Sequence, residues 1–148
     1  MKIKKILAIL PYLLPWFIST IIFKMDTNFY NNLNLPVIAP PPITFAIVWP
    51  ILYLLISISI YKIIPKSDNK YKISLITNYL SNQLFTLFFF TFKNTFLALI
   101  DTIIVLISSI YLYIQTKKTD ETASKYIIPY IIWNIYALLL IGSIYFMN

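Results

Sequence analysis

Residues 43–61 read ITFAIVWPILYLLISISIY, a run without a single charged side chain that ends at Lys62. A bilayer core about 30 Å thick is crossed by an α-helix of about 20 predominantly apolar residues. This run therefore has the length and the composition of a transmembrane helix.

Four further runs of the same kind occur along the chain. With the first they predict five spans, over residues 6–23, 43–61, 73–92, 95–114 and 126–147. A β-barrel would need strands that alternate apolar and polar residues, whereas residues 84–92 are nearly all apolar. Because the spans leave only short connectors, we expect an all-α fold, a single integral membrane five-helix transmembrane bundle over residues 1–148.

The composition agrees with a membrane protein and excludes several functions. Hydrophobic residues make up 59% of the chain and charged residues 11%, against about 25% charged residues in soluble domains. Cysteine and histidine are absent, which excludes disulfides, Cys/His metal sites and catalysis by a nucleophile–histidine pair. The chain has one glycine, too few for a phosphate-binding loop. We expect no metal, no cofactor and no nucleic-acid partner.

The lysines predict the orientation in the membrane. Met1 to Lys5 and the apolar run that follows resemble a secretion signal, but the run is long and no small-x-small cleavage site precedes Lys24, so we take it as the first helix. Five spans then place two lysines, Lys24 and Lys93, on one side. The other side holds Lys2, Lys4, Lys5, Lys62, Lys66, Lys70, Lys72, Lys117, Lys118 and Lys125. The positive-inside rule predicts a cell-membrane protein with its N-terminus in the cytoplasm and its C-terminus outside.

The connector from Lys24 to Pro42 differs from the other loops. Its first half is polar and turn-forming, and its apolar second half ends in Pro40-Pro41-Pro42. Proline is favoured at the start of a helix, so this segment is a rigid lead-in to the second span. It is either a linker with a helix start signal or a lid over a binding site, since long loops in compact folds are often functional.

Polar and tryptophan side chains at membrane depth suggest a cavity under this loop. Asn82 and Gln83 lie in the third span, Asp101 lies about 9 Å below the outer end of the fourth, and Trp49 lies at a similar depth in the second. With Trp133 as its floor, a cavity lined by Trp49, Asn82 and Asp101 is one interpretation. The other is that the amides and Asp101 join helices, Asp101 pairing with a neighbouring amide or hydroxyl.

Two further features of the spans are open to interpretation. Trp16, inside the first span, is best explained by packing. Pro50 removes a backbone hydrogen bond to Ala46 and either opens the helix beside Trp49 or is a packing kink.

Four motifs in order along the chain resemble the tryptophan-rich sensory protein/translocator protein (TspO) family, formerly called peripheral benzodiazepine receptors. They are Pro40-Pro41-x-x-x-Phe45-x-x-Val48-Trp49-x-x-Leu52-Tyr53, Asn78-Tyr79-x-x-Asn82-Gln83-Leu84, Asp101 and Pro129-Tyr130-x-x-Trp133-x-x-x-Ala137. The resemblance covers essentially the whole chain. It implies binding of porphyrins such as protoporphyrin IX, and in some members of sterols and synthetic drugs, in a cavity beneath the first loop, and often a homodimer.

The candidate ligand-binding residues follow from the cavity and the resemblance together. They are Phe29, Pro41, Phe45, Trp49, Tyr53, Asn82, Gln83, Asp101, Trp133 and Ala137. Trp49 and Trp133 match tryptophans linked to light-dependent porphyrin breakdown in bacterial members, so they are the catalytic candidates if the protein is an enzyme.

The chain also departs from the family pattern. Phe29 and Ile38 stand where the first loop usually carries tryptophans, Pro42 replaces a common glycine, and the sterol motif of animal members is missing. The functions in competition are a porphyrin-binding sensor, carrier or scavenger, a light- and oxygen-dependent porphyrin-degrading enzyme, and a small transporter or structural bundle.

Overall fold

The structure, a computed structural model, describes residues 2–148, with side chains from residue 7 onward except that of residue 27. The expected all-α fold is confirmed, because residues 2–148 form helices and no strand. The side chains of Lys2, Lys4 and Lys5, three of the lysines used to predict the orientation, lie outside the described residues.

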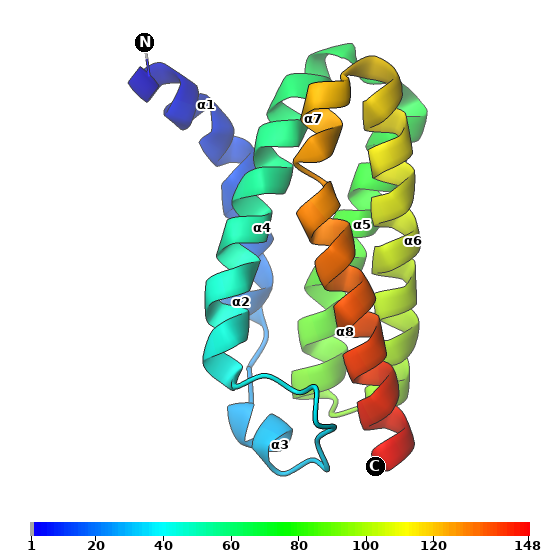
Figure 1. The fold of residues 1–148 in the computed structure, drawn as a ribbon. Helices are drawn as coiled ribbons and strands as arrows, with labels where there is room; N and C mark the ends of the chain where they lie inside the picture. Colours follow the sequence, from blue (N-terminus) through cyan, green and yellow to red (C-terminus); the bar gives the residue numbers. More distant parts are fainter. Residues whose placement is uncertain (1) are drawn as a thin grey trace.

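The helices form five columns that pack side by side (Figure 1). The elements are α1 (Lys2–Leu13), η1 (Leu14–Phe17) and α2 (Ile18–Ile22) in the first column, α4 (Pro42–Ile63) and η2 (Ile64–Lys66) in the second, α5 (Asn69–Thr86) and η3 (Leu87–Thr91) in the third, α6 (Thr95–Thr119) in the fourth, and α7 (Glu121–Lys125) and α8 (Ile128–Met147) in the fifth. The short helix α3 (Thr27–Asn31) lies in the long connector between the first two columns. The polar half of this connector, expected to form turns, is therefore partly helical, and Asp26 caps α3 by accepting a hydrogen bond from the Asn28 amide.

Several helices extend beyond the apolar runs that predict the spans. Within residues 2–148, three stretches are long and apolar enough to cross a membrane, Pro42–Lys66, Thr95–Thr119 and Glu121–Met147, and Leu7–Ile22 is a shorter apolar helix. The third column is less apolar because the residues that α5 buries are mainly serines, amides and threonine. That all five columns cross the bilayer stays a prediction.

Side-chain caps and prolines set where the helices begin. Asp68, Asn94 and Asp120 each accept a hydrogen bond from a backbone amide in the first turn of α5, α6 and α7. Pro42 is the first residue of α4, as the proline start signal predicts. The helix then continues unbroken through Pro50 to Ile63, so Pro50 does not open the helix beside Trp49.

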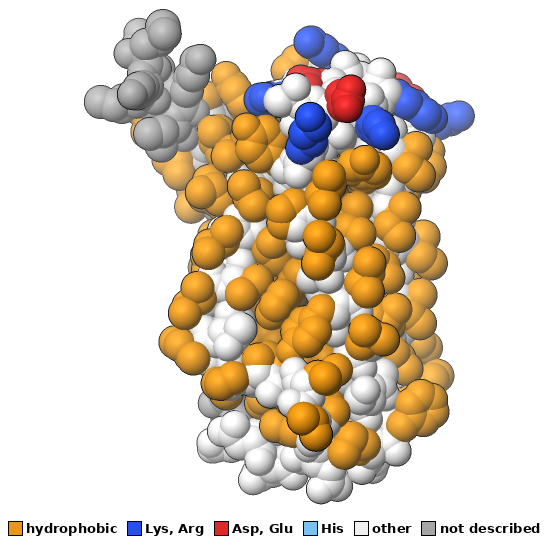
Figure 2. Space-filling model, in the orientation of Figure 1, with side chains coloured by type: hydrophobic (Ala, Val, Ile, Leu, Met, Phe, Trp, Pro, Cys, Tyr) orange, Lys and Arg blue, Asp and Glu red, His pale blue; other side chains and the backbone are white. Residues whose placement is uncertain are grey.

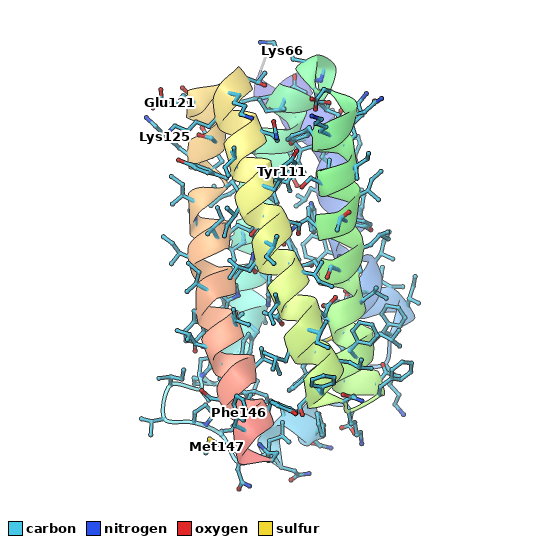
Figure 3. The ribbon with its side chains drawn as sticks, turned by 90° about the vertical axis from the view of Figure 1, so that its right-hand side faces the viewer. Lys66, Tyr111, Glu121, Lys125, Phe146 and Met147 are labelled. Carbon is cyan, nitrogen blue, oxygen red and sulfur yellow. The ribbon has the colours of Figure 1, made fainter. Side chains whose placement is uncertain are left out.

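The surface separates into an apolar flank and a charged end. On the face drawn in Figure 2 hydrophobic side chains cover the middle of the bundle, and lysines gather at the end where α7 begins. In Figure 3, Lys66, Glu121 and Lys125 lie at that end and Phe146 and Met147 at the other. An apolar belt beside a charged end suits a bundle that sits in a bilayer.

The first column is broken, and other helices stabilise the break. Pro15 has no N–H group and is the second residue of the 3-10 turn η1, so the regular α-helical hydrogen bonding of the column is interrupted there. The Ser57 hydroxyl of α4 donates to the Tyr12 carbonyl at 3.0 Å, and the Tyr79 hydroxyl of α5 donates to the Pro15 carbonyl at 2.7 Å. Backbone groups freed within a membrane need such partners.

Gln83 of α5 bridges the same break with both ends of its amide. Its Oε1 accepts from the Ser19 amide at 2.8 Å, and its Nε2 donates to the Trp16 carbonyl at 3.2 Å. Trp16 itself is buried in the core between the first column and α4, which confirms the packing interpretation. Gln83 thus fastens a broken helix to its neighbour.

Candidate ligand-binding site

An aromatic cluster occupies the region where the sequence predicts a cavity. The Trp49 and Trp133 rings, from α4 and α8, meet edge to face with centroids 6.3 Å apart. Phe45 packs on Trp133 at 6.1 Å, and Tyr53 stacks on Trp49 at 5.4 Å. Four candidate residues on two helices are therefore in contact. In this structure these rings pack against one another between α4 and α8.

The Trp133 side chain carries an unused hydrogen-bond donor. Its indole Nε1 is buried and has no partner among the described residues. A buried N–H group without a partner costs about 1–3 kcal/mol. The donor lies on a ring that also packs on Tyr136, at 5.0 Å. A ligand with an acceptor oxygen at this position would remove that cost.

Buried amides and tyrosine hydroxyls form a polar network at the inner edge of the cluster. The Tyr53 hydroxyl donates to Asn82 Oδ1 at 2.8 Å, and Asn82 Nδ2 donates to the Tyr130 hydroxyl at 3.2 Å. Tyr130 in turn donates to Asn78 Oδ1 at 3.1 Å. Asn82 therefore ties α4 and α8 to α5. It joins helices, and it also contacts Tyr53, the residue whose ring stacks on Trp49.

Asp101 and Gln83 lie away from the aromatic rings. Asp101 on α6 accepts a hydrogen bond from the Ser81 hydroxyl of α5, while its Oδ2 is buried without a partner among the described residues. Gln83 is engaged with the first column, as described above. Both residues make the helix-joining contacts that were the alternative interpretation.

The long connector covers the cluster from the end of the bundle opposite the lysine-rich end. Tyr30 of α3 packs on Phe45 at 5.8 Å, and its hydroxyl donates to the Pro40 carbonyl at 3.1 Å. The Tyr136 hydroxyl of α8 donates to the Ile38 carbonyl at 2.7 Å. Phe29 packs edge to face on Phe89 at 5.3 Å, on the side of η3. The connector thus holds Tyr30 against the rings and Phe29 away from them.

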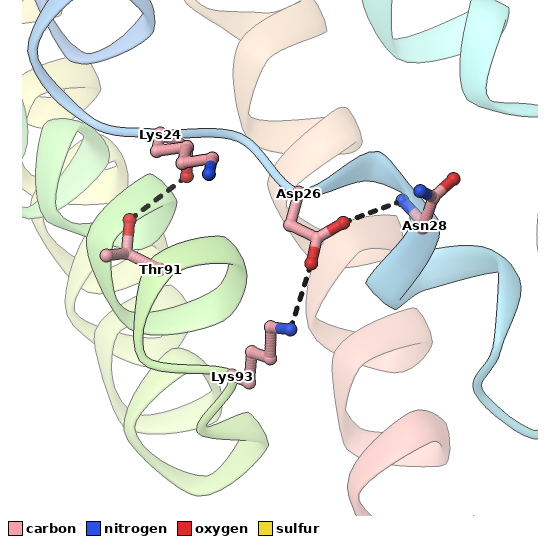
Figure 4. A network of polar contacts seen from close by, with 5 residues as sticks. All are labelled: Lys24, Asp26, Asn28, Thr91 and Lys93. Carbon is pink, nitrogen blue, oxygen red and sulfur yellow. Dashed lines mark hydrogen bonds and ion pairs between the residues drawn. The ribbon is translucent and has the colours of Figure 1, made fainter.

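Figure 4 shows how the start of the connector is fastened to the turn between η3 and α6. Lys93 Nζ lies 2.9 Å from Asp26 Oδ2, and the Thr91 hydroxyl donates to the Lys24 carbonyl at 3.2 Å. Lys93 adopts the left-handed backbone conformation, with φ of 52°, which is uncommon for a residue other than glycine. The Lys93 ammonium donates to the carboxylate and holds the pKa of Asp26 below its ordinary value.

Asparagines fasten the middle of the connector to the end of α8. The Asn34 amide donates to Asn148 Oδ1 at 2.9 Å, and Asn148 Nδ2 donates to the Asn34 carbonyl at 3.1 Å. The connector is therefore tied to the bundle at its start, its middle and its end. All of these ties are hydrogen bonds or an ion pair at partly exposed positions, so each is weak.

The two remaining candidates lie at the edges of the site. Pro41 is the exposed cap of α4, where its carbonyl accepts from the Thr44 amide at 2.9 Å. Ala137 is half-buried on α8, one turn after Trp133.

Grooves on the outside of the bundle are separate from this site. One of about 270 Å³ lies between α5 and α6, and one of about 210 Å³ lies between the first column and α5. Neither is lined by a candidate ligand-binding residue.

The fold and the order of these residues agree with comparisons to known proteins. A profile of the TspO/MBR family matches residues 7–147. The chain belongs to the TspO/MBR family. It is 31% identical over 136 residues to the tryptophan-rich protein TspO of Bacillus cereus, covering 90% of this chain and 89% of that protein.

Two further relatives show the same extent of similarity to this TspO/MBR chain. It is 36% identical over 131 residues to the uncharacterized membrane protein YtaB of Bacillus subtilis, covering 86% of this chain and 84% of that protein. It is 29% identical over 128 residues to the tryptophan-rich protein TspO of Archaeoglobus fulgidus, covering 82% and 80%. Membership in the TspO/MBR family, together with the apolar helices, makes the chain an integral membrane protein.

Sequence reasoning missed two parts of the site. Tyr130 is fully buried and joins Asn82 to Asn78, yet it entered only as part of a motif. Tyr130 lies three residues before Trp133, on the same face of the helix, and this spacing could have indicated that it belongs to the site. The pair between Asp26 and Lys93 had no local signal, because its members are far apart in the sequence.

Proposed function

We propose that this TspO/MBR protein binds a tetrapyrrole of the protoporphyrin IX type, or a related flat hydrophobic molecule, between α4 and α8 beneath the connector. The observation that carries the proposal is the buried Trp133 indole N–H without a partner, set among aromatic rings. The tetrapyrrole class comes from the family resemblance. The protein acts as a sensor, carrier or scavenger of this ligand.

Binding exchanges contacts that the cluster already makes. A flat ligand that enters between Trp49 and Trp133 replaces their edge-to-face contact with ring–ligand contacts of a similar kind. A carboxylate or carbonyl oxygen of the ligand accepts a hydrogen bond from Trp133 Nε1. Phe45 and Tyr53 supply further ring faces, and Asn82 positions Tyr53 through its hydrogen bond.

The connector governs access to this site. Tyr30 contacts Phe45 directly, so the connector must move for a ligand to reach the rings. Its ties to the bundle are individually weak, which permits such movement without unfolding the helices.

A titration in darkness tests the proposal. Protoporphyrin IX is added to the purified protein in detergent, and tryptophan emission is followed, with a panel of other tetrapyrroles and an apolar compound that is not a tetrapyrrole as comparisons. We expect saturable quenching at one site per chain for the tetrapyrroles. Quenching that never saturates, or that is equal for the apolar compound, would overturn the proposal.

A second candidate function is light- and oxygen-dependent breakdown of the bound porphyrin. The observation that favours it is the direct contact of two oxidisable indoles, Trp49 and Trp133. Phenylalanine keeps an aromatic face but is much harder to oxidise, so Trp49→Phe and Trp133→Phe retain measurable binding and lose bleaching of porphyrin absorbance under illumination. If the wild-type protein bleaches porphyrin no faster than a protein-free detergent control, the enzyme function is wrong.

The membrane, the orientation and the oligomeric state of the protein are also proposals. The chain lies in the cell membrane with its lysine-rich end in the cytoplasm and the connector outside, and it pairs with a second copy as a homodimer. Chemical cross-linking in native membranes tests the dimer through a species of twice the mass. No specific observation favours a small transporter or a purely structural bundle.

A further inference from the structure

A groove lies on the outside of the bundle, between the first column and α5, in the half nearer the lysine-rich end. Its volume is about 210 Å³. The lining comes from three helical columns and includes Tyr12, Pro15 and Trp16 of the first, Ile60 of the second, and Leu75 and Tyr79 of the third. We call it the Trp16 groove.

The wall of the Trp16 groove is apolar although it contains a broken helix. The carbonyls of Tyr12, Pro15 and Trp16 accept hydrogen bonds from side chains of α4 and α5. The Tyr79 hydroxyl, the polar group of this lining side chain, is itself satisfied because it donates to the Pro15 carbonyl. A break that would normally show polar backbone to the bilayer is therefore sealed, and the groove suits a hydrocarbon chain.

The position of the groove indicates which kind of molecule would bind in it. Lys72 is exposed one turn above Leu75 and Ile76 on α5, and Tyr79 lies about 10 Å farther along the helix than Lys72 at 1.5 Å per residue. A positive charge at the membrane surface with an apolar groove descending from it matches the headgroup and acyl chain of an anionic lipid.

The charge around Lys72 supports the same assignment. The described side chains at this end include seven lysines, Lys62, Lys66, Lys70, Lys72, Lys117, Lys118 and Lys125, against Asp68, Asp120 and Glu121. Among the described residues the recorded ion pair is Lys93 with Asp26, at the other end of the bundle. Asp68 accepts from the Tyr71 amide as a helix cap and makes no ion pair with Lys72.

We propose that the Trp16 groove binds one acyl chain of an anionic phospholipid whose phosphate contacts Lys72. This inference does not depend on the ligand proposed for the tryptophan cluster. The site selects the lipid by charge, since the groove alone accommodates the chain of any phospholipid. A lysine near the surface favours an anionic lipid about five-fold.

Trp16 is a built-in reporter for this site. In a Trp49→Phe, Trp133→Phe background it is the single tryptophan, since the chain has three. The protein is reconstituted in vesicles that contain a lipid with brominated acyl chains, which quench a tryptophan lying close to them. This lipid is either phosphatidylglycerol or phosphatidylcholine at the same mole fraction. We expect about a five-fold preference of the groove for brominated phosphatidylglycerol.

Two variants of equal charge separate the groove from the general field of the lysines. Lys72→Gln removes the charge above the groove, and Lys118→Gln removes one from α6 at the same end. We expect the preference to vanish in Lys72→Gln and to persist in Lys118→Gln. Equal quenching by the two brominated lipids in the parent protein, or equal loss in the two variants, would overturn the proposal.

A second measurement covers the case in which the double tryptophan variant does not fold. Native mass spectrometry of the otherwise wild-type protein, released from mixed vesicles, counts the phospholipids that stay bound. We expect one retained phosphatidylglycerol, lost in Lys72→Gln and kept in Lys118→Gln. Retention of phosphatidylcholine in equal amount would contradict the site.

Discussion

Replacing Gln83 with leucine should destabilise the fold by separating the broken first column from α5. The substitution keeps a side chain of similar size but removes two hydrogen bonds, one from the Ser19 amide at 2.8 Å and one to the Trp16 carbonyl at 3.2 Å. Side-chain hydrogen bonds in membrane proteins contribute about 0.6 kcal/mol on average and up to about 1.7 kcal/mol. Two such bonds give an expected loss of about 1–3 kcal/mol.

The loss falls at the upper part of this range if the Ser19 amide finds no other partner. Ser19 is buried, 4% exposed, so water does not readily replace the amide oxygen. Trp16 lines the Trp16 groove, where the occupant proposed above is a lipid chain and not water. Gln83→Leu should therefore also loosen the first column selectively.

The assay is reversible unfolding in mixed micelles of lipid and detergent, followed by circular dichroism as dodecyl sulfate is added. Gln115→Leu is the matched control, because Gln115 of α6 is half-buried and its side chain makes no hydrogen bond to the described residues. The control should change the free energy of unfolding by less than about 0.5 kcal/mol. If Gln83→Leu is no less stable than Gln115→Leu, the bridging role of Gln83 is wrong.

Three other outcomes follow from the connector and the polar network. Asp26→Asn removes the ion pair with Lys93 and should speed tryptic cleavage after Lys24. In the wild type the pKa of Asp26 is lowered, so the stabilisation from this ion pair is present above the ordinary carboxyl pKa of about 3.9 and is lost as the pH falls through the lowered pKa. Single cysteines at Asn32 and Ser67, treated in intact cells with an impermeant thiol reagent, should label only at Asn32, and labelling at Ser67 alone would reverse the proposed orientation. Asn82→Leu should weaken porphyrin binding by about 1–2 kcal/mol in a fluorescence titration, and unchanged affinity in the folded variant would leave Asn82 as a helix-joining residue.

The helical architecture could be predicted from the sequence because a membrane leaves few alternatives. Long apolar runs flanked by lysine indicate spanning helices, and proline before residue 43 indicates where α4 begins. The observed helix ends differ from the predicted ends of the spans, because the length of an apolar run does not include the polar turns that extend a helix beyond the bilayer. α6 continues to Thr119 for this reason. Pro11 and Pro15 within the first span predict a bend or compensation by neighbouring helices, but not which proline breaks the helix. Pro11 stays within α1, while Pro15 is the second residue of η1.

The residues of the candidate site were easier to predict than their contacts. Depth along each helix brought Trp49, Trp133 and Asn82 to one region, but depth does not give rotation about the helix axis. Asp101 therefore entered the predicted lining although it faces Ser81. Gln83 faces the first column for the same reason. Whether rings fill a space or line it depends on side-chain packing, which periodicity does not report.

The most direct test of the central claim is the dark affinity for protoporphyrin IX of Trp133→Phe compared with Trp16→Phe. Both variants exchange an indole for a phenyl ring, but only Trp133→Phe removes the buried N–H that has no acceptor among the described residues. We predict binding weaker by about three- to ten-fold in Trp133→Phe, the effect of one hydrogen bond, and affinity close to wild type in Trp16→Phe. Equal affinities in the two folded variants would contradict ligand binding at the Trp133 indole.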